Sequence, residues 1–150
     1  MKTKLYLLSI FFVLFFQNIN SQSKTYQLLR YKTHLFIELT LNDKSCLFII
    51  DSGSSYSLID ISKSKEFGFN YIEFGEQKYV TANGTCQVYL VYDYLISELN
   101  YDFFGINLSK ITIYLEKEFE TKLPIIGILG ADFLCDKKVK LNYENNTIEF

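Results

Sequence analysis

The stretch Phe48-Ile49-Ile50-Asp51-Ser52-Gly53-Ser54-Ser55 carries the recognisable chemistry of this chain. An apolar run of high β propensity stops at an acidic residue, and a small hydroxyl residue and a glycine follow it. Glycine permits a tight turn that most side chains would hinder. The pattern therefore predicts a strand that ends at Asp51 and a loop that holds its carboxylate there. Such a carboxylate can act as a general base if its surroundings shift its pKa.

Two strands are predicted before this stretch, at residues 25–29 and 33–41. In the second, Leu35, Ile37 and Leu39 alternate with a more polar set that includes His34, so we expect this histidine to be partly exposed and not catalytic. Turn residues at 42–44 lead into the apolar run at 46–50. A hairpin is thus expected to deliver Asp51 to a strand end.

The chain after the motif predicts a short helix, a hairpin and a closing hairpin. Residues 60–68 read as the helix, with Asp60 as its N-cap and Gly68 at its end. Residues 78–90 hold two β-prone runs joined by Asn-Gly, a strong hairpin signal. Further strand material is expected within 91–115, including 111–115, followed by a solvated charged loop at 117–120. Residues 138–143 and 147–150 flank the turn of the closing hairpin.

Asp51-Ser52-Gly53-Ser54-Ser55, with apolar residues on both sides, resembles the active-site motif of aspartic proteases, hydrophobic-hydrophobic-Asp-[Ser/Thr]-Gly-[Ala/Ser]-Ser. A second stretch, Pro124-Ile125-Ile126-Gly127-Ile128-Leu129-Gly130-Ala131-Asp132-Phe133-Leu134, resembles the hydrophobic-hydrophobic-Gly segment that runs beside the catalytic loop in that family and leads into a short helix. The two occur in the family's order, with room for a flap hairpin between them. The chain therefore resembles retropepsin-like aspartic proteases, of the small, secreted, single-lobe type found in bacteria.

This resemblance implies an all-β fold, a retropepsin-like closed β-barrel with one or two short helices. It implies that Asp51, Ser52 and Gly53 are the catalytic motif, and that Ser54, Ile128, Leu129 and Gly130 support the site. The hairpin between the motifs would be the flap, which closes over bound peptide, and its candidate substrate-binding residues are Ala82, Asn83, Gly84 and Thr85. No cofactor is implied.

Aspartic proteolysis needs two carboxylates that share a proton, because like charges about 3 Å apart cannot both be ionised. This chain has one Asp-[Ser/Thr]-Gly sequence, and the pair is missing after the other aspartates we considered: Asp43, Asp60, Asp93, Asp102, Asp132 and Asp136. We therefore expect a homodimer with one Asp51 from each copy at a two-fold axis. The resemblance implies the same arrangement, with the Ser52 hydroxyls bracing the two loops. Asp60 is explained as a helix cap, and Asp132 is expected to be structural.

Two other functions are compatible with parts of this pattern. The same scaffold could be a peptide-binding or interaction module without turnover, since a fold does not fix a function. The intact Asp51-Ser52-Gly53 argues against that reading. A serine hydrolase that uses Ser54 or Ser55 is disfavoured, because there is no Gly-x-Ser-x-Gly sequence and the single histidine lies on an upstream strand.

The first residues predict export. Lys2 and Lys4 precede an apolar run at residues 5–16 and a polar stretch follows, which is the layout of a secretory signal peptide. Twelve helical residues cover about 18 Å, against the ~30 Å of a bilayer core, so a retained membrane anchor is disfavoured. We expect a signal peptide at residues 1–22 and a protease domain at 23–150, in the periplasm or outside the cell.

Composition and charge limit the partners. The chain of 150 residues is 49% hydrophobic and 21% charged, which fits one globular domain. Removing residues 1–22 takes two of the 15 basic residues and none of the 17 acidic ones, so the net charge moves from −2 to about −4. A nucleic-acid partner is not indicated. The cysteines, Cys46, Cys86 and Cys135, lack metal-ligand spacing and are expected to be mostly buried core thiols.

Overall fold

The computed structural model describes residues 23–150 apart from residues 82–83 and 97. The predicted signal peptide therefore lies outside the described residues. The strands and helices occur in the following order: β1 (Thr25–Tyr31), β2 (His34–Leu41), β3 (Lys44–Ile50), β4 (Leu58–Asp60), the 3₁₀-helix η1 (Ile61–Lys63), α2 (Ser64–Phe67), β5 (Asn70–Thr81), β6 (Gly84–Tyr92), β7 (Phe104–Ile106), α3 (Ser109–Phe119), β8 (Ile125–Leu129), α4 (Ala131–Asp136), β9 (Lys140–Asn142) and β10 (Thr147–Glu149).

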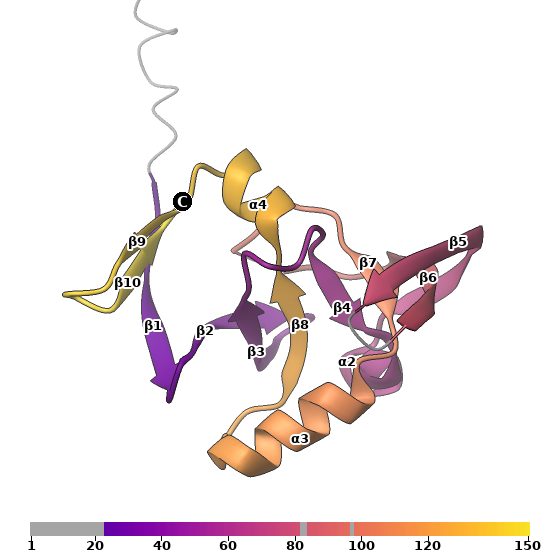
Figure 1. The fold of residues 1–150 in the computed structure, drawn as a ribbon, viewed down its shortest axis with the longest axis horizontal. Coiled ribbons are helices and arrows are strands. Elements are labelled where there is room, and N and C mark those ends of the chain that lie inside the picture. The colour runs from indigo at the N-terminus through magenta and orange to yellow at the C-terminus, as the bar shows by residue number, and fades with distance from the viewer. Residues whose placement is uncertain (1–22, 82–83, 97) are drawn as a thin grey trace, which may run out of the picture.

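The strands form one sheet in the order β5-β6-β7-β4-β8-β3-β2-β1-β10-β9. The β9–β10 hairpin with β1 lies at one side of the molecule and the β5–β6 hairpin at the other (Figure 1). This is the mostly-β, retropepsin-like architecture expected from the sequence. Hydrogen bonds between the described strands do not close the sheet, because β5 and β9 are its two ends.

The β2–β3 hairpin places the predicted catalytic strand at the centre of the sheet. Asn42 and Asp43 form its two-residue loop and both have positive φ, 45° and 63°. Such loops favour these residue types, because they tolerate the left-handed conformation and match the twist of the strands. β3 also pairs in parallel with β8, so it is hydrogen-bonded on both edges. His34 is exposed at the start of β2, as predicted.

Both faces of β3 are buried. Cys46 and Phe48 belong to the main core, whereas Leu47 and Ile49 pack in a second cluster with Leu115 of α3. This second cluster also includes Phe36 of β2. Phe36 lies on the face of β2 that the sequence pattern predicts to be polar. It is fully buried, whereas the polar side chains on the same face are not. A strand with no solvated face resists any register shift, because a slip would expose apolar side chains on either side.

Residues 109–119 form a helix, α3, and the predicted strand at 111–115 and charged loop at 117–120 are wrong. Thr112 and Leu115 are buried at helical spacing while Ile113, between them, is exposed. The side chain of Asn107 accepts a hydrogen bond from the amide of Ser109 at 3.1 Å, which satisfies a donor of the first turn. Burial of one helical face and this local contact outweigh the β propensity of the isoleucines and threonine.

The shorter predictions are confirmed with adjustments. The helical segment after the motif is η1 followed by α2, with Asp60 as N-cap and Gly68 in the left-handed conformation at φ 72°. The central hairpin starts earlier than expected, at Asn70, and Gly84 is already paired with Thr81. The closing hairpin is β9–β10.

The cysteines are free, and only one is a core thiol. Cys46 is buried, whereas Cys86 is half-buried and Cys135 is exposed, so the expectation of mostly buried thiols is wrong for two of the three. Burial raises the pKa of the Cys46 thiol to about 12, which keeps it protonated and unreactive at neutral pH. Within the described residues, no helix is both long and apolar enough to span a membrane.

Candidate active site

Asp51 lies in the loop directly after β3, and its side chain is exposed. The Asp51 amide donates to the carbonyl of Leu129 at 3.1 Å, which extends the β3–β8 pairing by one residue. The Gly53 amide donates to Asp51 Oδ1 at 2.9 Å. The backbone therefore fixes the position of the carboxylate, while the exposed carboxyl group can still receive a second acid or a water.

Strand β8 and Gly130, which follows it, pack against the Asp51 loop. Ile128 pairs with Ile49, and Leu129 pairs with Ile50. A Cβ on Gly130 would lie 2.5 Å from the Tyr56 carbonyl oxygen, so only glycine permits this approach of the two segments. The supporting residues predicted from the sequence, Ile128, Leu129 and Gly130, thus lie together against the loop.

Ser57 and Asp132 tie the end of the loop to helix α4. Asp132 accepts from the Ser57 hydroxyl at 2.7 Å and from the Ser57 amide at 3.0 Å. The Ser57 hydroxyl accepts in turn from the Gly130 amide at 2.9 Å, and the Ala131 amide donates to the Ser54 carbonyl at 2.8 Å. Asp132 is structural, as expected from the sequence. Its partner Ser57 was missed, because a contact across 75 residues leaves no local signal.

Ser57→Ala is expected to lower the free energy of unfolding by about 2 kcal/mol, since it removes two hydrogen bonds and leaves the buried Gly130 amide without a partner. Urea unfolding of the two proteins would measure the difference. Ser55→Ala is the matched control, because Ser55 lies in the same loop and is exposed. Equal midpoints for all three proteins would contradict the bracing role of Ser57.

The β5–β6 hairpin contacts the Asp51 loop through Tyr79 of β5. Ser54, which is buried, has its hydroxyl 3.1 Å from the hydroxyl of Tyr79 on β5. Of the predicted flap residues, Gly84 and Thr85 are exposed at the start of β6, whereas Ala82 and Asn83 lie outside the described residues. The sequence alone does not reveal the contact between the hairpin and the loop, because Tyr79 and Ser54 are 25 residues apart.

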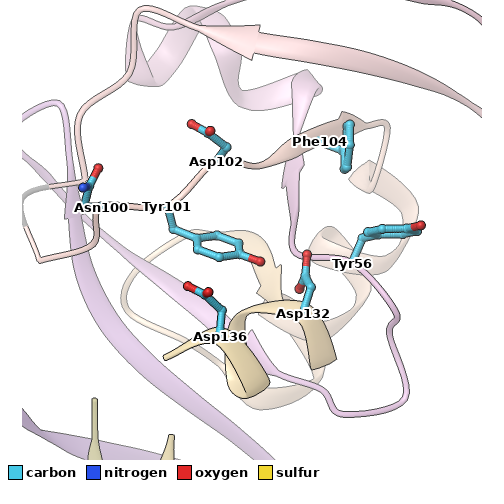
Figure 2. A pocket seen from close by; sticks show the side chains of 7 residues that line it. All are labelled: Tyr56, Asn100, Tyr101, Asp102, Phe104, Asp132 and Asp136. Carbon is cyan, nitrogen blue, oxygen red and sulfur yellow. The ribbon is translucent and has the colours of Figure 1, made fainter. Parts of the chain in front are cut away.

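Two cavities adjoin this region. One of about 170 Å³ lies under the hairpin and is lined by Tyr56, Lys78, Tyr79, Val88 and Phe104. The other, of about 610 Å³, shares Tyr56 and Phe104 with it and is also lined by Asn100, Tyr101, Asp102, Asp132 and Asp136 (Figure 2). Asp51 lines neither cavity, whereas Tyr56, five residues after it in the chain, lines both.

The larger cavity is acidic and holds a tyrosine. Figure 2 shows the Tyr101 ring reaching toward Asp132 and Asp136 on α4. Burial, followed by the negative charge of Asp132 and a hydrogen bond to it, raises the pKa of Tyr101 to about 12. Tyr101 therefore stays neutral. In the part of the chain that the structure describes, no group of three His, Cys, Asp or Glu side chains is arranged to hold a metal ion.

Two other aspartates of the described chain are already engaged in hydrogen bonds. Asp60 is fully buried and accepts from Ser62, Leu108 and Thr112, and Asp132 is engaged by Ser57. Both carboxylates therefore serve the fold of their own chain. The chain carries one Asp-Ser-Gly sequence, with Asp51 as its acid.

The sequence matches a family model described as aspartyl protease over residues 37–133, which is more than half of the chain. This match spans β3, the Asp51 loop, the hairpin, β8 and the first residues of α4. No curated protein sequence matches the chain.

Solved structures match the fold. The crystal structure of a retropepsin-like aspartic protease from Rickettsia conorii has a TM-score of 0.51 and 15% identity, over 85% of this chain and 90% of that one. The EIAV protease complexed with the inhibitor HBY-793 has a TM-score of 0.47 and 12% identity, over 76% and 97% of the chains. The retroviral protease-like domain of Ddi1 from Leishmania major has a TM-score of 0.45 and 15% identity, over 77% and 86%.

Proposed function

The chain belongs to the aspartyl protease family, and from this premise we propose that it is a retropepsin-like endopeptidase that hydrolyses peptide bonds as a homodimer. The observation that carries the proposal is the exposed Asp51 carboxylate, held by the Gly53 amide and by the pairing of its own amide with Leu129. An interaction module would have no need of a carboxylate fixed in this way.

In the proposed reaction, Asp51 of one copy is ionised and takes a proton from a water molecule, which attacks the scissile carbonyl carbon. The protonated Asp51 of the other copy donates a hydrogen bond to the carbonyl oxygen. The two acids can hold these different states because adjacent carboxylates share one proton. Proton transfer to the leaving nitrogen then completes hydrolysis, with no cofactor required.

In this proposal a second chain supplies the second Asp51, since Asp60 and Asp132 are already engaged in hydrogen bonds within the chain. A two-fold axis beside the exposed loop would bring the two Asp51 side chains together and place Ser52 of each copy at the interface. The terminal strands β1 and β10 pair with each other within the chain, and β10 also pairs with β9. We place the contacts of the proposed dimer at the Asp51 loop and the flap.

The substrate would be an extended peptide that lies between the flap and the Asp51 loop, where strand edges can hydrogen-bond its backbone. We further propose that the protein is exported and acts outside the cytoplasm, on the basis of the signal-peptide pattern of residues 1–22. Cleavage before residue 23 would leave the first described strand, β1, intact.

One observation favours a second candidate, a peptide-binding module without turnover. The chain has one Asp-Ser-Gly sequence, and strands β1 and β10 pair with strands of the same chain. A protein that stayed monomeric would keep the flap and cavities without the dyad. The oligomeric state in relation to activity therefore separates the two candidates.

The specific activity of the mature chain is expected to fall on dilution. Below the dimer dissociation constant, the dimeric fraction is proportional to concentration, so a tenfold dilution should lower the rate per chain by about tenfold. A fluorogenic peptide assay over a concentration series, with sizing at the same concentrations, would measure this. A statine-type inhibitor serves as the control for aspartic proteolysis. Cleavage at a constant rate per chain by a proven monomer would contradict the shared dyad.

A further inference from the structure

The β5–β6 hairpin consists of an inner and an outer part. The inner part pairs Asn70–Glu73 with Tyr89–Tyr92, and the outer part pairs Lys78–Thr81 with Gly84–Gln87, with a register shift between Glu73 and Lys78. Strand β7 pairs with Tyr89 and Leu90, which belong to the inner part. Among the described strands, sheet pairing beyond the hairpin itself therefore reaches only the inner part.

Tyr79 makes the polar contact between the outer part and the catalytic loop. Its hydroxyl is 3.1 Å from Ser54 Oγ. Ser54 Oγ also lies 2.7 Å from the Tyr56 carbonyl oxygen, which can only accept. A serine hydroxyl has one hydrogen, and Ser54 gives it to Tyr56. Tyr79 is therefore the donor, and Ser54 is the acceptor of this hydrogen bond.

Aromatic packing supports the same contact. The Tyr79 ring meets the Tyr56 ring edge to face, with centroids 6.0 Å apart, and Tyr56 packs in the same way on Phe104 at 5.6 Å. Such pairs add to the stabilisation that area burial provides. The Ser54 carbonyl is already engaged, since it accepts from the Ala131 amide at 2.8 Å. Among the described residues, the outer part of the hairpin thus contacts the loop at Ser54, three residues from Asp51.

We propose that the hydrogen bond from Tyr79 to Ser54 is a latch that holds the flap of each protomer on its own catalytic loop, which makes Tyr79 a positioning residue for peptide binding. The inference rests on the proposed function, since it assumes that peptide binds between flap and loop. A flap that is already seated in the free enzyme loses less freedom when the peptide binds. The latch therefore lowers KM and leaves the chemistry at Asp51 unchanged.

Hydrogen exchange tests the latch without any catalysis. In Tyr79→Phe the ring and its packing remain and only the donor is lost. We expect the amides of residues 78–81 and 84–87 to exchange about fivefold faster than in the wild-type mature chain, the factor typical of one net hydrogen bond. Ser54→Ala should have a similar effect, and the double variant should add little, because the two changes remove one shared bond. Tyr71→Phe on the same strand is the control.

Steady-state kinetics with a peptide substrate give the second readout. Tyr79→Phe is expected to raise KM about fivefold and to leave kcat within about twofold. Unchanged exchange in Tyr79→Phe, additive effects in the double variant, or a loss of kcat at constant KM would each overturn the latch. If the wild-type chain cleaves no peptide, the proposed function fails, yet the exchange experiment still decides whether the hydrogen bond seats the hairpin. If cleavage is normal and exchange is unaffected, only the latch fails.

Discussion

Asp51→Asn is expected to lower kcat/KM for peptide cleavage by about 10³-fold, within the range that general acid–base catalysis contributes. The amide cannot take a proton from water, so neither copy in the dimer can supply the base. The fold should be retained, because the Asn Oδ1 can still accept from the Gly53 amide. A fluorogenic peptide assay beside a urea unfolding curve would measure both effects. Asp43→Asn is the control, since Asp43 is exposed and its positive φ suits asparagine.

Mixing the two proteins makes this prediction specific to a dyad formed between chains. At a wild-type concentration above the dimer dissociation constant, a tenfold excess of Asp51→Asn should draw most wild-type chains into mixed dimers. A mixed dimer has an Asp51 in only one of its two chains and is expected to be inactive. The peptidase activity of the mixture should therefore be about tenfold lower than that of the same amount of wild-type protein alone. Full activity in the mixture would show that one chain acts alone. Full activity of the Asp51→Asn protein by itself would remove the proposed mechanism altogether.

The sequence predicted those parts of the site that depend on neighbouring residues. The apolar run before Asp51 and the glycine after it specify a strand and a turn, and Asn42-Asp43 specifies the hairpin that leads there, because these residues restrict their own backbone angles. The position of β8 beside the Asp51 loop was predicted because two stretches of the sequence resemble two motifs of the same protease family. Its physical cause, the close packing that Gly130 permits, becomes visible only when the two segments are side by side.

The wrong strand prediction at 111–115 and the two missed hydrogen bonds have a common physical cause. Each depends on contacts between residues that are far apart in the sequence. The residues at 111–115 have β propensity, yet burial of Leu115 against β3 and β8 makes them helical. The Ser57–Asp132 and Ser54–Tyr79 hydrogen bonds join residues 75 and 25 positions apart. Serine, tyrosine and aspartate occur on any surface, so no local pattern marks these residues as partners.

Asp60 shows both what the sequence predicts and what it omits. Its role as the N-cap of the helical segment is confirmed, since Oδ1 accepts from the Ser62 amide at 3.1 Å. The same oxygen accepts from the Leu108 amide at 3.0 Å, and Oδ2 accepts from the Thr112 hydroxyl at 3.0 Å. The carboxylate is fully buried, and it joins the end of β4 to the first turn of α3. It is therefore a structural connection between the two halves of the chain.

Asp60→Ala is expected to lower the free energy of unfolding by about 3–5 kcal/mol, because two amides and a hydroxyl lose their shared acceptor in the interior. Asp60→Asn keeps one acceptor oxygen and should lose about half as much, since the Thr112 hydroxyl can turn to accept from the new amide group. Urea unfolding midpoints would rank the proteins. Glu66→Ala removes an exposed carboxylate from the adjacent α2 and should change stability by less than about 0.5 kcal/mol. Similar midpoints for Asp60→Ala and Glu66→Ala would show that the buried carboxylate does not hold β4 and α3 together. If Asp60→Asn keeps its peptidase activity while Asp51→Asn loses it, the two acids have separate roles. The buried Asp60 then serves the fold, and the exposed Asp51 serves the reaction.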